Sequence, residues 1–109
     1  MSAEGFILYY GLRFVVSDEA EVELLENLTH PKLQAAAEAG LQDWWGRTTD
    51  EEIYFLLIGT ELGNLGWEGV SDRQIEDDEL VSIMQTTKAR LRQAGFAQPP
   101  ALHAQFEPD

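Results

Sequence analysis

The chain offers few side chains whose type and spacing could support catalysis. It contains two histidines, His30 and His103, and no cysteine. A histidine can exchange a proton near neutral pH, so His103, on the outward side of the last predicted strand, is a candidate general base. His30 stands directly before Pro31 and is better explained as part of a helix junction. Neither histidine has carboxylates at the spacing of a metal-ligand motif, so we expect no metal ion and no cofactor.

A lone cation interrupts the first apolar run of the chain. Residues 6–16 read Phe-Ile-Leu-Tyr-Tyr-Gly-Leu-Arg-Phe-Val-Val, a β-branched and aromatic pattern that predicts a strand. Because side chains alternate along a strand, Arg13 should share a face with Tyr9. On such an apolar face Arg13 could pair with the carboxylate of a ligand. His103 and Gln105 of the last predicted strand are expected on the same face, so all four residues are candidates for a ligand site or an interface.

The three tryptophans complete the set of candidate site residues. Trp44 and Trp45 are adjacent in a predicted strand, so they point to opposite faces of the sheet. We expect one of them in the core, while the other could be a binding hot spot. Trp67 lies in a glycine-rich segment, where it either anchors the loop or lines a pocket.

Other motifs of catalysis and ligand binding are missing from the sequence. The glycines of residues 59–69 are not followed by the lysine of a phosphate-binding loop, and Glu61 and Glu68 would repel a phosphate. The acidic run 76–79 lacks the central glycine and alternating oxygen ligands of a calcium loop, so helix capping and solvated surface explain it better. No serine or threonine stands in a nucleophile elbow. Paired-carboxylate chemistry stays open because acids are numerous, but the sequence as a whole leans against an enzyme.

Charge is the strongest signal in the composition. Twenty acidic residues against seven basic ones give a formal net charge of −13. Nucleic acids and anionic membrane surfaces are bound through lysine and arginine, so this charge argues against both partners. It favours high solubility or attraction to a basic partner. There is no cysteine, no basic signal-peptide start and no apolar run of about 18 residues, so we expect a soluble cytoplasmic protein.

The apolar patterns predict a single acidic α+β domain over residues 1–109. Strands are expected over residues 6–16, 42–48, 52–59 and 101–107. A first helix begins at Asp18, is broken near Pro31 and continues to Ala39, because proline lacks the backbone donor that a helix interior needs. A second helix is expected over residues 77–94. Residues 59–76 are expected to form a long glycine-containing loop between the third strand and this helix.

The order of these elements indicates a fold. β-α-β-β-α-β is the order of the ferredoxin-like two-layer sandwich, an antiparallel sheet with the helices on one face. In that fold the first and third strands form the central pair. Residues 6–16 and 52–59 are apolar on both faces, as central strands are. The element order and the hydrophobic pattern therefore agree.

The sheet face without helices is the basis of the functional hypotheses. An apolar face needs a cover, and the candidates are a second copy of the chain, the loop 59–76, or a small molecule. The leading hypothesis is a small non-enzymatic protein-binding or regulatory domain that forms a homodimer through this open face. One alternative is a small-molecule-binding protein or enzyme with a pocket between the sheet and the Trp67 loop. The other is an acidic inhibitor or immunity-type protein that binds a basic partner.

Overall fold

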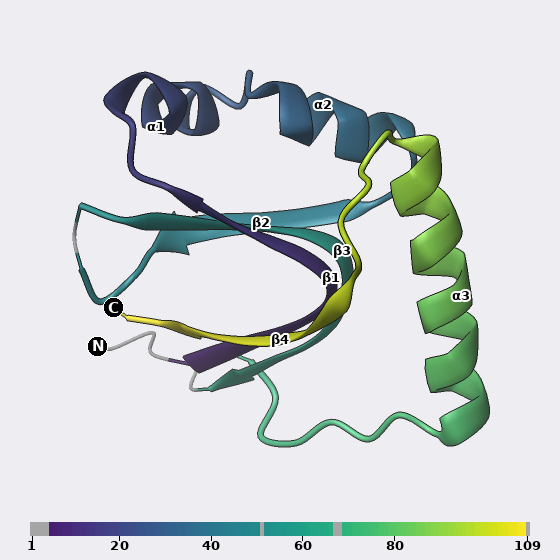
Figure 1. Cartoon of the computed structure of the whole chain (residues 1–109). Coiled ribbons are helices and arrows are strands. Elements are labelled where there is room, and N and C mark those ends of the chain that lie inside the picture. Colours follow the sequence, from purple (N-terminus) through teal and green to yellow (C-terminus); the bar gives the residue numbers. More distant parts are fainter. Residues whose placement is uncertain (1–4, 51, 67–68, 109) are drawn as a thin grey trace.

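The structure, a computed structural model of the chain, describes residues 5–50, 52–66 and 69–108. Within these ranges four strands form one antiparallel sheet in the order β2-β3-β1-β4, accompanied by three helices (Figure 1). β1 and β3 are the central strands, as the sequence predicts. In chain order the elements are β1 (Gly5–Val16), α1 (Glu19–Glu26), α2 (Pro31–Glu38), β2 (Gln42–Arg47), β3 (Tyr54–Gly66), α3 (Asp77–Gln93) and β4 (Ala101–Glu107).

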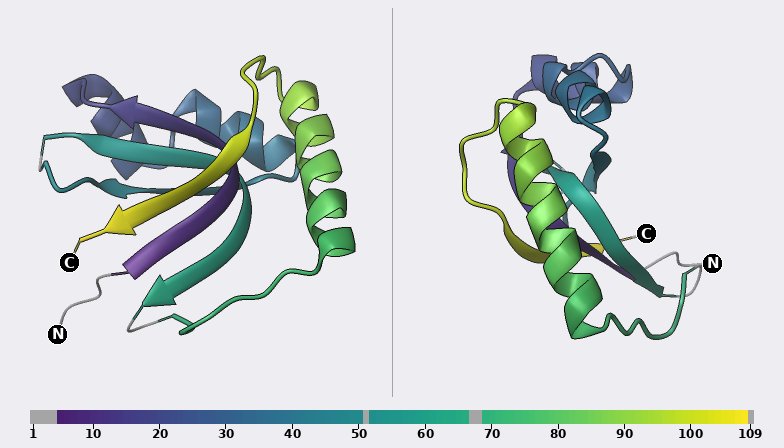
Figure 2. Two further views of the ribbon diagram at one scale, coloured as in Figure 1. Left: turned by 60° about the horizontal axis from the view of Figure 1, so that its bottom comes forward. Right: turned by 90° about the vertical axis from the view of Figure 1, so that its right-hand side faces the viewer.

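The predicted ferredoxin-like sandwich is only partly correct. The α+β class, the central position of the first and third strands and the antiparallel pairing are confirmed. The element order, however, is β-α-α-β-β-α-β, which is not the standard ferredoxin-like arrangement. Figure 2 shows a further difference. The sheet is bent, and α1 and α2 cover one part of it, while α3 lies beside the bend, apart from the other two helices.

β1 and β3 bend together near the middle of their lengths (Figure 1). In this middle part Gly11 of β1 pairs with Gly59 of β3. Their φ angles are 157° and 156°, which residues with a Cβ atom rarely adopt. A Cβ on Gly11 would lie 2.1 Å from the Ile58 carbonyl oxygen, and one on Gly59 would lie 2.1 Å from the Tyr10 carbonyl oxygen. The two central strands can therefore approach and turn together at this point only because both positions are glycine.

The bend divides the sheet into two arms. The β2 arm consists of β2 with residues 12–16 and 54–58, and the β4 arm consists of β4 with residues 5–10 and 60–66. The inner faces of the arms are turned toward each other, and the helices lie on the outer face (Figure 1). Strands that bend in this way form the corners of orthogonally packed sheets.

Each face of the sheet has its own hydrophobic cluster. The inner cluster contains Ile7, Tyr9, Phe55 and Leu57, with Trp44 packed against it. The outer cluster lies between the β2 arm and the helices, and its buried members are Leu12, Val16, Leu25, Leu33, Ala36, Leu41, Tyr54, Leu56, Ile58 and Leu91. The even-numbered side chains of β1 in this arm thus face the helices, as the alternation of a strand requires.

The predicted loop over residues 59–76 is wrong in its first half. β3 continues to Gly66 and pairs with β1 as far as Gly5. The register shifts once, between Leu8 and Tyr9, where β3 accommodates one extra residue as a β-bulge. Glycine is unfavourable in strands on average, which is why the sequence pattern indicates an end at Gly59. The pairing with β1 overrides that local preference.

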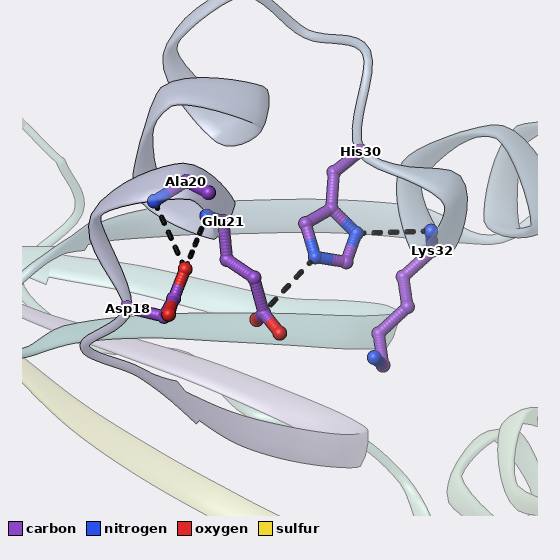
Figure 3. A network of polar contacts seen from close by, with 5 residues as sticks. All are labelled: Asp18, Ala20, Glu21, His30 and Lys32. Carbon is purple, nitrogen blue, oxygen red and sulfur yellow. Dashed lines mark hydrogen bonds and ion pairs between the residues drawn. The ribbon is translucent and has the colours of Figure 1, made fainter.

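The break between α1 and α2 is held by side chains (Figure 3). Asp18 caps α1, because its Oδ1 accepts hydrogen bonds from the amides of Ala20 and Glu21. The buried His30 caps α2, because its Nδ1 accepts the Lys32 amide at 3.1 Å. Its Nε2 lies 3.7 Å from Glu21 Oε2, so one histidine joins both helices. The prediction of a helix-junction role for His30 is confirmed.

In the described ranges no helix is long and apolar enough to cross a membrane.

Candidate functional site

Five of the predicted site residues lie on the inner face of the sheet. Tyr9 pairs with His103 across β1 and β4, and Arg13 and Gln105 meet because Arg13 Nε donates to Gln105 Oε1 at 2.7 Å. His103 Nε2 lies 3.2 Å from the Gly11 carbonyl oxygen. The fifth residue, Trp44, approaches this group from β2. The structure therefore brings together the four residues that strand alternation predicts on one face, Tyr9, Arg13, His103 and Gln105, and adds Trp44 to them.

Trp44 also connects the two opposite edges of the sheet. Its Nε1 donates to Glu107 Oε2 at 2.9 Å, which joins the β2 edge to the β4 edge. This contact is possible only because the bend brings the two arms together. The inner cluster beneath it is filled, since Ile7, Tyr9, Phe55 and Leu57 are each at most 1% exposed within a single chain.

The inner face therefore differs from the open apolar surface that the sequence predicts. The sheet covers most of this face itself, and Val15 is the exposed large apolar residue that remains on it. Arg13 is exposed, and its Nε donates a hydrogen bond to Gln105. The polar residues of this face mainly hold the two arms in place.

Burial disfavours the charged forms of two side chains, Tyr9 on the inner face and Asp43 on β2. Burial raises the pKa of the Tyr9 phenol well above its ordinary value, and the negative charges of Glu61 and Asp43 raise it further. Burial also raises the pKa of the Asp43 carboxyl. Tyr9 therefore stays a neutral phenol, which can donate a hydrogen bond but cannot serve as a base or nucleophile at physiological pH.

The other two predicted residues have different outcomes. Trp45 packs with the outer cluster, and its ring centroid lies 6.2 Å from that of Tyr54. Both tryptophans of the pair are half-buried, and each packs against the hydrophobic cluster on its own face of the sheet. Trp67 lies outside the described residues.

A cleft lies on the outer face of the β4 arm, beside the N-terminal half of α3. Its volume is about 420 Å³ and its surface is mainly apolar. The lining side chains come from the sheet, from the segment before α3 and from α3 itself: Leu8, Tyr10, Leu62, Arg73, Ile75, Leu80, Met84 and Leu102. It borders the segment that follows Trp67, but it lies on the opposite face from the pocket that the sequence predicts.

The cleft exists because α3 is anchored at one end. Leu91 and Thr87 of its C-terminal half are buried, and Thr87 Oγ1 shares a 2.6 Å hydrogen bond with Thr60 Oγ1. Toward the N-terminus, Leu80 and Met84 are only half-buried and Val81 is exposed. The helix therefore stands off the β4 arm over its first turns.

Arg73 is the main polar group of the cleft, and its guanidinium is held in place by two backbone carbonyls and an acidic side chain. Its Nε donates to the Leu62 carbonyl at 3.0 Å and its Nη1 donates to the Gln74 carbonyl at 2.6 Å. Its Nη2 lies 4.0 Å from a carboxylate oxygen of Glu79. Arg73 thus fixes the segment before α3 against β3, which leaves an apolar lining for any occupant.

A second cleft, of about 570 Å³, lies between α1 and the start of β3 and has four glutamates in its lining. These glutamates do not form a metal site. Among the described residues, no three histidine or acidic side chains gather closely enough to hold a metal ion.

Sequence reasoning missed the outer cleft because its residues match an ordinary core pattern. Leu80 and Met84 fall on the apolar stripe of α3, and Leu102 falls on the expected inward side of β4. A weak signal was available, since Val81 adds an apolar side chain beside that stripe on an otherwise polar helix surface.

Comparisons with known proteins do not assign this site. No protein-family model matches the chain, and no curated protein or solved structure gives a significant match. The function is therefore argued from the cleft, its lining and the charge around it.

Proposed function

We propose that this chain is a small binding domain without a reaction of its own, and that its outer cleft accepts an apolar side chain from a basic protein segment. The observation that carries the proposal is the half-open apolar cleft between α3 and the β4 arm. The proposal keeps the soluble, cytoplasmic setting expected from the acidic, cysteine-free composition.

The lining of the cleft favours an apolar occupant. Seven of its eight side chains carry aliphatic or aromatic surface, and the eighth, Arg73, is engaged with backbone carbonyls and Glu79. A polar substrate would lose its hydrogen bonds to water here without replacing them. A leucine or phenylalanine side chain would instead remove apolar surface from water on both partners.

The charge of the molecule favours a basic partner. The first turn of α3 carries Asp77, Asp78 and Glu79 directly beside Leu80 of the cleft, and Glu76 precedes them. The whole chain has a net charge of −13. Lysines or arginines that flank an apolar anchor would be attracted to this surface, most strongly at low ionic strength.

The test uses a peptide in which lysines flank one leucine. Two control peptides replace the leucine with serine or the lysines with glutamates. In isothermal titration calorimetry at low salt, the lysine–leucine peptide should bind at least about tenfold more tightly than the serine peptide, because a buried leucine contributes roughly 1.5–3 kcal/mol. Binding should weaken as salt is added, and the glutamate peptide should not bind.

Two variants on one helix locate the binding. Met84→Glu places a carboxylate in the cleft and should abolish binding, whereas Val81→Glu makes the same charge change on an exposed neighbour and should preserve it. Circular dichroism should show both variants to be folded. Equal affinity for the leucine and serine peptides, or no binding at low salt, contradicts the proposal.

A small apolar molecule is the second candidate for the cleft. The volume of about 420 Å³ lies within the range of small-molecule sites, and the few polar groups in the lining would restrict the ligand to a neutral apolar compound. The neutral dye Nile red would test this. A fluorescence increase that Met84→Glu removes and Val81→Glu retains favours a small ligand, and an unchanged spectrum argues against it.

The structure supports a homodimer through the inner face less strongly than the sequence pattern does. The four central apolar side chains of that face are already buried in one chain, so a partner there would remove little further apolar surface from water.

A further inference from the structure

We propose that two copies of this chain associate through β4, whose exposed edges pair antiparallel around Ala104. This inference concerns the edge of β4 rather than the cleft, although Leu102 belongs to both surfaces. It does not depend on the proposed binding of a basic segment.

β4 is an edge strand with little of the usual protection, apart from the contact of Trp44 with Glu107 at its C-terminal end. Within the described ranges it pairs only with β1, in a continuous register from Gly5–Glu107 to Gly11–Ala101. Edge strands are normally protected by lysines, prolines, bulges or short length. The sequence of β4, Ala-Leu-His-Ala-Gln-Phe-Glu, contains no lysine or proline, and no bulge interrupts its pairing. Pro100 and Pro108 instead limit the edge to these seven residues.

The opposite edge of the sheet provides a contrast. β2 is one residue shorter and carries Asp43, Gly46 and Arg47 among its six residues. Charges and glycine disfavour the addition of another strand. The two edges therefore differ, and β4 is the one whose composition suits pairing.

The sequence of β4 is complementary to itself. In an antiparallel pair centred on Ala104, all seven residues find partners. Leu102 lies opposite Phe106 of the second copy, and His103 lies opposite its Gln105. Glu107 lies opposite the small Ala101, so no like charges face each other. Apolar side chains meet on the outer face and polar ones on the inner face, as stable cross-strand pairs require.

The exposure of β4 fits such a pair. Leu102 is 65% exposed and Ala104 is also exposed, although both lie on the apolar outer face. Phe106 stacks edge-on against Phe6 at a centroid distance of 5.4 Å, and Phe6 is itself 47% exposed. Pairing would place Leu102 of each copy beside the Phe6–Phe106 pair of the other.

The net charge gives this association a distinctive salt dependence. Two chains of −13 repel each other, and added salt screens the repulsion without weakening backbone hydrogen bonds or apolar contacts. Dimerisation should therefore strengthen as salt is raised. Binding of a basic segment to the cleft should weaken under the same change, so one proposal can fail while the other holds.

Analytical ultracentrifugation of the whole chain at low and high salt is the test. We expect a monomer–dimer equilibrium that moves toward the dimer at high salt. Ala104→Lys places two like charges opposite each other at the centre of the pair and should lower the association constant at least about tenfold, although it reduces the overall repulsion. Val81→Lys makes the same charge change away from β4 and should leave the association intact or strengthen it.

Hydrogen exchange identifies the surface used. The amides along β4 should become more protected as the protein concentration rises. A chain that stays monomeric at high salt and high concentration overturns the proposal. So does an Ala104→Lys variant that dimerises like the unmodified chain, or a dimer in which β4 gains no protection.

Discussion

Tyr9 shows how the bend of the sheet alters the chemistry of a single residue. It is 1% exposed on the inner face, and burial together with the charges of Glu61 and Asp43 raises the pKa of its phenol. In the unfolded chain the same group ionises near pH 10. The folded state therefore holds this proton more tightly than the unfolded state does.

This difference predicts a specific loss of stability in alkali. Below the unfolded pKa both states keep the proton, and Tyr9 has no effect on pH dependence. Above about pH 10 the unfolded state loses it first, so the free energy of unfolding should fall by about 1.4 kcal/mol per pH unit until the folded pKa is reached. Tyr9→Phe should remove this contribution. Urea unfolding of both proteins between about pH 8 and pH 11 measures this contribution. Parallel pH profiles for the two proteins would contradict the assignment.

The contacts of His30 lead to a prediction about the free energy of unfolding. Its imidazole caps α2 through Nδ1 and reaches Glu21 of α1 through Nε2 (Figure 3). His30→Ala should lower the free energy of unfolding by about 1–3 kcal/mol, because a helix cap and a buried contact are lost. His30→Asn keeps an acceptor for the Lys32 amide and should lose less. Equal losses in thermal or urea unfolding would show that the cap contributes little.

The central strands depend on the paired glycines at the bend. A methyl group at Gly11 would meet the Ile58 carbonyl oxygen at 2.1 Å in a conformation with φ of 157°. Gly11→Ala should therefore destabilise the fold by at least about 3 kcal/mol, since neither strand can move away without breaking the pairing. Urea unfolding measures the loss.

Gly95, at the end of α3, supplies the control for that substitution. Its φ is 90°, but a Cβ there would meet nothing within 4 Å. Gly95→Ala should cost only the conformational strain, about 1–2 kcal/mol. If both alanine variants lose the same stability, the close approach of β1 and β3 at the bend is not essential.

The sequence predicts the elements better than their arrangement. The two-sided apolar character of β1 and β3 places them correctly at the centre of the sheet, and Pro31 correctly marks the break in the first helical region. The bend was not predictable, because it depends on Gly11 meeting Gly59 across a distant pairing. Each glycine alone indicates only a local irregularity or a strand end.

The same limit applies to the candidate site. Alternation along the strands correctly groups Tyr9, Arg13, His103 and Gln105, because that grouping depends on local geometry and sheet order. Whether the group is open or covered depends on the angle between the two arms, which no local pattern specifies. The outer cleft depends on how closely α3 approaches the β4 arm, and this too is a property of packing.

At the scale of the whole molecule, the bend determines which apolar surface stays available for binding. The inner face is closed within the chain by Trp44 and Glu107, whereas the outer face of the β4 arm keeps apolar surface that α3 covers incompletely. This surface belongs to a chain of net charge −13. A basic partner at the cleft and a second copy at β4 would both use this arm, with opposite responses to salt.

The central claim is that the outer cleft, and not the inner face, receives the partner. Nuclear magnetic resonance of the chain titrated with the lysine–leucine peptide tests it most directly. We predict that the methyl signals of Leu80 and Met84 shift with added peptide while the indole N–H signal of Trp44 stays in place. Shifts of the Trp44 indole and of Arg13, with Leu80 and Met84 unchanged, would contradict the account.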